Sequence, residues 1–300
     1  MIVIGAPSEY VGSASAEMLP ALADLSGHVV WRAHARVTSA VEGVLPPSVD
    51  IHSYAALVAL GDGVPRSQQA LAQTVSVSRT TIMRVAADLA DRGLVERVRN
   101  PADRRSYLLS RTPEGEVAAT SWHRHVAALE EAVTAGLTAR QRDDLRSLLR
   151  RIVEPELPSD TPEELRSSIA FLVARLHMRM RVEFTAVLAP LGIDPPHVGI
   201  LTALVATGPI SQSELARAFA VSGAHMVQLV DELEERGLVS RRRLDTDRRT
   251  QVLDLQPGAE DCLARARVLA DEVVDARLAP LTPTQADRLL DLLRRVIATA

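Results

Sequence analysis

The feature that most constrains this chain is an internal repeat with a fixed offset of 144 residues. Gly93-Leu94-Val95 recurs as Gly237-Leu238-Val239, and Asp103-Arg104-Arg105 recurs as Asp247-Arg248-Arg249. Leu137-Thr138 returns as Leu281-Thr282 at the same offset, so the two copies align without a gap. Repeat units of solenoids are about 20–50 residues long. A period this long therefore indicates a duplicated domain.

The repeat also predicts the domain boundaries. We assign repeat 1 to residues 1–153, a linker to residues 154–162 and repeat 2 to residues 163–300. The linker holds three prolines and has no apolar periodicity, which is typical of a short, stiff connection. Thr161 is expected to cap the next helix, with Pro162 as its first residue.

Composition excludes several classes of protein. All 34 basic residues are arginine, and the net charge of -4 requires any nucleic-acid contact to use a local basic surface. The single cysteine, Cys262, excludes an internal disulfide framework and is expected to be unreactive beside Glu260 and Asp261. Apolar runs are shorter than a membrane helix needs, so we expect a cytoplasmic protein without a membrane partner. Motifs of common enzymes are missing, so we expect no catalysis, cofactor or metal.

Each repeat has the same succession of patterns. In repeat 1 they predict a mainly helical fold with a small β-hairpin: helices at 15–44, 51–60, 67–74, 78–92, 113–135 and 138–153, and strands at 94–99 and 106–109. Two short helices followed by a hairpin with arginines at its tip are typical of a winged helix-turn-helix, whose second helix enters the DNA major groove.

The candidate DNA-reading segments differ in charge between the repeats. Residues 78–105 hold seven arginines and four acidic residues, whereas residues 222–249 hold six of each. Arginine can reach guanine edges or phosphates, and an arginine at a hairpin tip can enter the minor groove. The candidate DNA contacts are Ser78, Arg79, Thr80, Thr81, Arg84, Arg104 and Arg105 in repeat 1, and Ser222, His225, Gln228, Arg248 and Arg249 in repeat 2.

The hairpin residues of repeat 1 resemble the MarR family of transcriptional regulators. The resemblance rests on Gly93-Leu94-Val95 with Arg97, on Asp103 and Arg105, and on Thr112 and Gly115. In repeat 2, Leu255-Gln256-Pro257-Gly258 departs from the last part of the pattern. Family members usually work as homodimers, so the resemblance implies a monomeric chain that forms an intramolecular pseudo-dimer. It also implies a regulator, expected to be a repressor, that binds double-stranded DNA at an asymmetric or imperfectly palindromic operator.

The resemblance further implies a small-molecule effector, because many family members are released from DNA by an aromatic or anionic ligand. The candidates for binding it lie on the first long helix of each repeat. They are Trp31, Arg32, His34, Arg175 and His177. Each of these side chains is also compatible with an ordinary place on a helix surface or in an interface.

A second function stays open at this point. Repeat 2 has weaker base-reading chemistry, so it can instead serve mainly to support the fold. The chain would then be a protein-interaction module derived from a DNA binder. Binding to DNA that weakens steeply with salt separates the two functions, because phosphate contacts release counterions.

Overall fold

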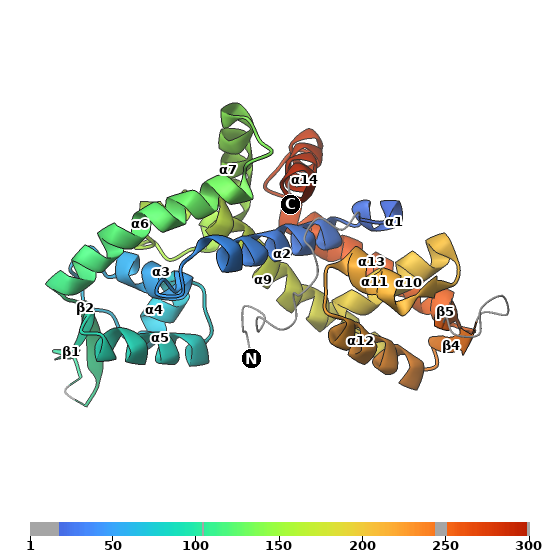
Figure 1. Cartoon of the computed structure of the whole chain (residues 1–300), viewed down its shortest axis with the longest axis horizontal. Coiled ribbons are helices and arrows are strands. Elements are labelled where there is room, and N and C mark those ends of the chain that lie inside the picture. The colour runs from blue at the N-terminus through green and yellow to red at the C-terminus, as the bar shows by residue number, and fades with distance from the viewer. Residues whose placement is uncertain (1–17, 104, 244–250, 299–300) are drawn as a thin grey trace. The chain divides into compact units, whose positions relative to one another are not determined.

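The computed structural model describes residues 18–103, 105–243 and 251–298, which form two compact units (Figure 1). Unit 1 contains Val37–Ala135 and Arg142–Arg175. Unit 2 contains the described residues up to Arg36, then Gly136–Gln141 and the chain from Leu176 onward. Three candidate DNA contacts lie outside the described residues: Arg104, Arg248 and Arg249.

Two long helices are shared between the units. The first part of α2 (Ser26–Val44) belongs to unit 2, and the first part of α9 (Ile169–Leu188) belongs to unit 1. Each compact unit therefore combines the winged helix of one repeat with the start of the long helix of the other repeat.

The helix expected over residues 15–44 is interrupted. A single turn, α1 (Pro20–Ala23), ends at Asp24, and α2 starts at Ser26. Asp24 closes this turn with its backbone N–H directed to the carbonyl of Leu22. Aspartate has a low helix propensity in a helix interior, which explains why the helix is interrupted at Asp24.

Unit 1 contains the winged helix of repeat 1. Its elements are α3 (Ile51–Ala59), α4 (Gln68–Thr74), α5 (Arg79–Asp91), β1 (Val95–Arg99), β2 (Tyr107–Arg111) and α6 (Pro113–Val133), followed by α7 (Ala139–Val153). The strands pair antiparallel, with Val95 opposite Arg111 and Arg99 opposite Tyr107. Apolar side chains at helical spacing on α5, such as Ile82, Val85 and Leu89, are buried against α3, α4 and the hairpin.

The carboxylate of Glu130 on α6 covers the N-terminus of α9 within unit 1. It accepts hydrogen bonds from the backbone N–H of Ile169 at 3.2 Å and of Ala170 at 3.0 Å, and from the hydroxyl of Ser168. The first N–H groups of a helix have no partner inside the helix, and the helix dipole favours negative charge there. Glu130 therefore stabilises the start of α9.

The segment between the repeats is held by hydrogen bonds. A 3₁₀ turn, η1 (Glu154–Glu156), precedes a short helix, α8 (Glu163–Arg166). The guanidinium of Arg166 donates to the carbonyls of Thr161, Pro158 and Ser159. Pro162 stands at the N-cap of α8, so the prediction of Thr161 as the cap was wrong by one residue.

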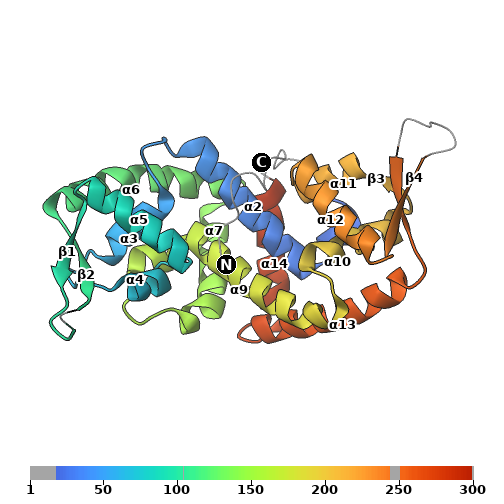
Figure 2. The same ribbon diagram turned by 90° about the horizontal axis from the view of Figure 1, so that it is seen from below.

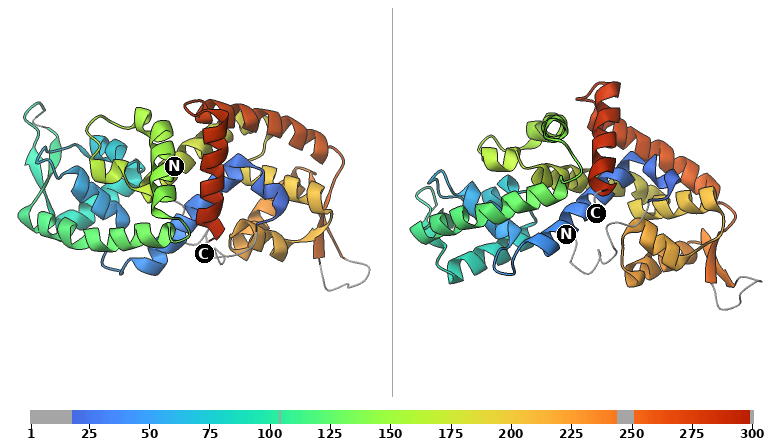
Figure 3. Two further views of the ribbon diagram at one scale, coloured as in Figure 1. Left: turned by 90° about the horizontal axis from the view of Figure 1, so that it is seen from above. Right: turned by 45° about the horizontal axis from the view of Figure 1, so that its top comes forward.

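Unit 2 repeats this winged helix with one added strand (Figure 2). Its elements after α9 are η2 (Ala189–Leu191), α10 (Pro195–Thr207), β3 (Ile210–Ser211), α11 (Gln212–Phe219), α12 (Gly223–Glu235), β4 (Val239–Arg243), β5 (Gln251–Leu255), α13 (Ala259–Leu278) and α14 (Pro283–Ala298). The strand order is β3-β5-β4, with Ile210 opposite Leu253 and Val239 opposite Leu255. Figure 3 shows α14 turning away from the axis of α13.

Both units match the expected fold class, which is mainly helical with small antiparallel hairpins. The last helix of each repeat, α7 and α14, buries a stripe of apolar side chains. They comprise Leu145, Leu148, Leu149 and Ile152 on α7, and Leu289, Leu292, Leu293 and Val296 on α14. Among the described residues, no single helix has the length and hydropathy to cross a membrane; α9 with η2 and α10 passes that test only as a pair bent by 71°.

Candidate nucleic-acid interface and ligand cavity

The recognition helices α5 and α12 begin and end in the same way. The hydroxyl of Ser78 accepts the N–H of Thr81 at 3.0 Å, and the hydroxyl of Ser222 accepts the N–H of His225 at 3.1 Å. After each helix a glycine adopts a left-handed backbone, Gly93 at φ 69° and Gly237 at φ 67°. The second helix of each pair is thus fixed at both ends.

The outer face of α5 carries four exposed side chains: Arg79, Thr80, Met83 and Arg84. Thr81, also expected on this face, is half-buried, and its hydroxyl bonds to that of Ser78 at 2.8 Å. Both hydroxyls thereby form part of the helix cap. Sequence reasoning missed Met83, which is 51% exposed on the face that carries Arg79.

The outer face of α12 is less polar. Gly223, Ala224, Val227 and Gln228 are exposed on it, and Val227 is the counterpart of Met83 at the repeat offset. His225 is half-buried and lines a cavity on the other side of the helix. Of the base readers expected from α12, Gln228 is thus the side chain on the exposed face. The repeat alignment pairs Met83 with Val227, so an apolar residue at the same position of both recognition helices could be seen in the sequence.

The arginines of the two winged helices have different partners. In unit 1, Arg79, Arg97, Arg99 and Arg105 make no side-chain hydrogen bond or ion pair with another described residue. Arg84 is 64% exposed and lies 3.6 Å from Asp50. These guanidinium groups are therefore accessible to an anionic partner.

In the winged helix of unit 2, Arg236, Arg241 and Arg242 have internal partners, whereas Arg243 is exposed and makes no side-chain hydrogen bond or ion pair with another described residue. Arg241 forms ion pairs with Asp231, at 2.6 Å, and with Glu234, while Arg242 pairs with Asp254 at 2.6 Å. Arg236 donates to the carbonyls of Gly192 and Glu232. The charge difference read from the sequence is thus accompanied by a difference in available positive groups.

The hairpin tip of unit 1 is shaped by its aspartate. A carboxylate oxygen of Asp103 accepts the backbone N–H of Arg105 at 3.0 Å, and the side chain of Arg105 is exposed. Asp103 therefore fixes the backbone that presents the arginine.

Unit 2 contains a cavity of about 420 Å³ between α2, α9, α10, α12 and α13. Its buried wall is apolar and includes Val30, Met180, Phe184, Leu188 and Leu229. Trp31 also lines it. An apolar cavity of a few hundred cubic ångströms is typical of a small-molecule site.

Two buried histidines add polar atoms to this wall. His28 is 7% exposed and His177 is 9% exposed. The Nε2 of His28 and the Nδ1 of His177 have no hydrogen-bond partner among the described residues. Burial, with the nearby charge of Arg32, lowers the pKa of His28 to about 3, and burial also lowers the pKa of His177. Both rings are therefore neutral at neutral pH.

The structure separates the five ligand candidates. Trp31 and His177 line the cavity. His34 stacks on His177 with 4.2 Å between ring centroids but is not part of the lining. The guanidinium of Arg32 is buried and donates to the carbonyl of Ala218, and Arg175 belongs to unit 1. The lining residues that sequence reasoning missed come from five helices far apart in the chain.

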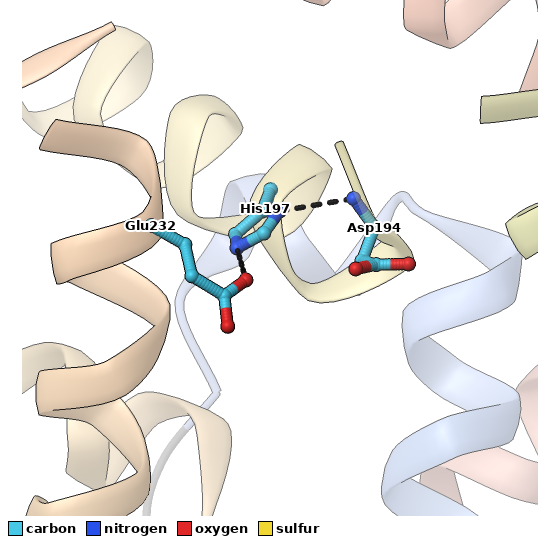
Figure 4. A group of neighbouring side chains, drawn as sticks. All are labelled: Asp194, His197 and Glu232. Carbon is cyan, nitrogen blue, oxygen red and sulfur yellow. Dashed lines mark hydrogen bonds and ion pairs between the residues drawn. The ribbon is translucent and has the colours of Figure 1, made fainter. Parts of the chain in front are cut away.

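Three further side chains meet at the edge of this cavity: Asp194, His197 and Glu232 (Figure 4). The Nδ1 of buried His197 accepts the backbone N–H of Asp194 at 2.9 Å, and its Nε2 lies 3.1 Å from a carboxylate oxygen of Glu232. Burial lowers the pKa of His197 despite Glu232, so the ring is neutral and carries its proton on Nε2. Neither nitrogen is then available to a metal ion.

Cys262 has the environment of an unreactive thiol. Burial raises its pKa, although Arg265 acts in the opposite direction. A thiol that is less ionised at neutral pH is a weaker nucleophile.

Comparison with known proteins agrees with this architecture. The MarR family matches residues 46–106 and again residues 191–250. A transcriptional regulatory protein for the hcr operon of Thauera aromatica is 32% identical over 136 residues, which are 45% of this chain and 78% of that protein.

Two solved structures are similar to single repeats. A transcriptional regulator from Pseudomonas aeruginosa is 29% identical (TM-score 0.42; 44% of this chain, 98% of that one). The repressor CouR, bound to a 23-mer DNA duplex, is 30% identical (TM-score 0.42; 44% and 93%). The chain belongs to the MarR family of transcriptional regulators.

Proposed function

We propose that this regulator binds double-stranded DNA as a monomeric pseudo-dimer and reads an asymmetric or imperfectly palindromic operator. The observation that carries the proposal is a contrast: Arg79, Arg84 and Arg105 of unit 1 are exposed, whereas Arg241 and Arg242 of unit 2 are held in internal ion pairs. Unit 1 then supplies most of the affinity, because arginine contacts to phosphates and guanine edges account for much of protein–DNA binding. A homodimer cannot divide its two half-sites in this way.

The proposed effect on transcription is repression, relieved by a small ligand. The cavity of unit 2 supports this, because His225, Leu229 and Glu232 of the recognition helix α12 form part of its wall. A ligand seated there contacts α12 directly and changes the geometry with which the helix meets DNA. Trp31 and Phe184 suit an aromatic ligand.

The experiment is selection of a binding site from random duplexes, followed by footprinting and titration at several salt concentrations. Arg105→Ala is expected to weaken binding by about tenfold, and Arg249→Ala by less. The footprint should show one half-site with stronger protection. Equal losses from the two substitutions would contradict the asymmetry.

The second function, a protein-interaction module in which repeat 2 is mainly structural, is favoured by the internally paired arginines of unit 2. It makes a different prediction in the same experiment. Selection would then recover no preferred duplex, and any residual DNA binding would be insensitive to Arg79→Ala and to salt.

A further inference from the structure

Two carboxylates of unit 1 have arginine partners close to its recognition helix. Asp50, at the N-cap of α3, lies 3.6 Å from Arg84 on α5. Asp88 lies 3.2 Å from Arg92 one turn further along the chain. The negative charge of each carboxylate is therefore balanced within the unit.

The counterparts in unit 2 are Asp194 and Glu232, and their arginines are lost or used elsewhere. The repeat offset places Gln228 where unit 1 has Arg84. It places Arg236 where unit 1 has Arg92, but the guanidinium of Arg236 donates to two backbone carbonyls. Among the described residues, neither carboxylate of this pair forms an ion pair with an arginine.

These two carboxylates lie close together. One oxygen of each, with a ring nitrogen of His197, falls in a group whose atoms are all within 4.8 Å of one another (Figure 4). Neutral His197 does not balance two negative charges. Like charges at this distance repel, and a cation between them removes that repulsion.

The same pair lines the apolar cavity, together with two more exposed carboxylates, Asp24 and Asp271. Arg181 is the one arginine in this lining. A cleft lined mainly by one sign of charge concentrates ligands of the opposite sign. Trp31 also lines the cavity, and the face of its indole ring can attract a cation.

Two histidines, His28 and His177, also belong to the wall of this cavity and are more than nine-tenths buried. Their ring nitrogens without a hydrogen-bond partner have almost no accessible surface, so they are enclosed within the wall. The rings therefore contribute neutral surface to the cavity and no positive charge that would oppose its carboxylates.

We infer that the cavity of unit 2 binds an amphipathic organic cation, with its apolar body against Trp31 and its ammonium group between Asp194 and Glu232. This inference rests on the proposed function only for the consequence that binding has for DNA. It replaces the anionic ligand class with a cationic one, because Arg32 lies outside the cavity lining whereas four carboxylates lie within it. A divalent metal is disfavoured because the Nδ1 of His197 already accepts the N–H of Asp194, which leaves the proton of the neutral ring on Nε2.

The first test compares three probes of similar shape: benzylammonium, benzyl alcohol and phenylacetate. Binding to the full chain is measured without DNA by calorimetry and by the fluorescence of Trp31 in the Trp122→Phe variant. The cation is expected to bind at least about tenfold more tightly than the alcohol, and the anion more weakly than either. Equal or tighter binding of phenylacetate overturns the inference, as does the absence of saturable binding of the cation at millimolar concentration.

The second test uses charge-neutralising variants. Asp194→Asn and Glu232→Gln are each expected to weaken binding of the cation by about fivefold, and asparagine keeps the ability to cap α10. Asp88→Asn in unit 1 is the matched control for Glu232→Gln and should leave binding unchanged. Asp271→Asn removes a carboxylate that also lines the cavity but is not part of the group around His197. Unchanged binding in all three variants of unit 2 overturns the inference.

Two further arms separate the alternatives. Saturable binding of Mn²⁺ alone that is lost in Asp194→Asn and competes with the organic cation would make this a metal site and overturn the inference. Loss of DNA binding in every variant, with binding of the cation intact, would contradict the proposed function and leave the cavity assignment supported.

Discussion

The winged helices of units 1 and 2 come from the two copies of one sequence repeat, yet residues at equivalent positions differ in charge and in their partners. Unit 1 pairs Asp50 with Arg84 and covers the start of α9 with Glu130. Unit 2 has Gln228 in place of that arginine and Val274 in place of that glutamate, and Val274 lines the cavity. The recognition helix of unit 1 presents exposed arginines, whereas that of unit 2 adjoins a cavity and its neighbours Arg241 and Arg242 are held in ion pairs.

The difference teaches how a duplicated binding domain can divide its tasks. In a homodimer every substitution appears in both halves, so a cavity gained by one half is gained by both. Fusion removes that constraint. We interpret unit 1 as the half that supplies affinity for DNA and unit 2 as the half that responds to a ligand.

The largest expected effect concerns acid stability, since buried neutral histidines are concentrated in unit 2. Burial lowers the pKa of His28 to about 3 and that of His34 to about 4, below the value of about 6.5 in an unfolded chain. As the pH falls below about 6.5 the unfolded state takes up protons first. Unit 2 therefore loses about 1.4 kcal/mol of stability per pH unit for each histidine, until the pH reaches the folded pKa.

The measurement uses the two tryptophans, since Trp31 lies in unit 2 and Trp122 in unit 1. Urea unfolding of the Trp122→Phe and Trp31→Phe variants follows each unit in turn. Between pH 7 and about pH 5, the unfolding midpoint reported by Trp31 should fall more than that reported by Trp122. A parallel fall at both reporters would remove this difference between the units.

The next largest effect concerns DNA. Arg79→Ala combined with Arg84→Ala removes both exposed arginines of α5 and should weaken operator binding by about a hundredfold, with a shallower salt dependence. Gln228→Ala, at the counterpart of Arg84, should cost less than about tenfold. Binding by gel shift or anisotropy measures both. A larger loss from Gln228→Ala would reverse the roles of the two units.

A smaller effect is expected at the start of α9. Glu130→Val copies the residue found in unit 2 and removes the acceptor for two backbone N–H groups, at a cost of about 2 kcal/mol in the free energy of unfolding. Urea unfolding followed at Trp122 measures it. Glu131→Val, an exposed neighbour, is the control. If both variants have the same free energy of unfolding, the hydrogen bonds that Glu130 accepts from the start of α9 do not stabilise the protein.

The smallest effect would transfer a feature of unit 1 to unit 2. Gln228→Arg restores the arginine that unit 1 holds beside Asp50, and the new guanidinium should pair with Asp194. Binding of benzylammonium is expected to weaken by about threefold to fivefold, while DNA binding becomes tighter. Calorimetry and anisotropy report the two changes separately. Tighter binding of the organic cation would show that Asp194 takes no part in its site.

The sequence predicts the locally determined parts of this molecule well. The residue pattern places a helix start at Ser78 and its end before Gly93, and the structure has both there, because capping depends on neighbours a few residues away. The break at Asp24 was missed because the apolar spacing continues through it. Boundaries of this kind depend on tertiary packing, which periodicity does not report.

The cavity could not be predicted in the same way. Helix faces identified Trp31 and His177, but the same pattern also selected Arg32, which donates to a carbonyl of Ala218 instead. Asp194 and Glu232 are brought together by the packing of α10 on α12. One usable signal was present: the repeat alignment shows a glutamine where its partner has arginine, which leaves a carboxylate unbalanced.

The sharing of α2 and α9 has a consequence for how the protein is made. The residues before Val37 leave the ribosome early, but the rest of unit 2 starts at Leu176. The hydrogen bond from Arg32 to Ala218 spans 186 residues, and contacts of such separation form slowly because a long loop must close first. Cutting the chain at residues 154–162 would give two fragments, neither of which contains a complete unit. The two halves can therefore diverge in sequence while each still supplies a segment that the compact unit of the other half uses.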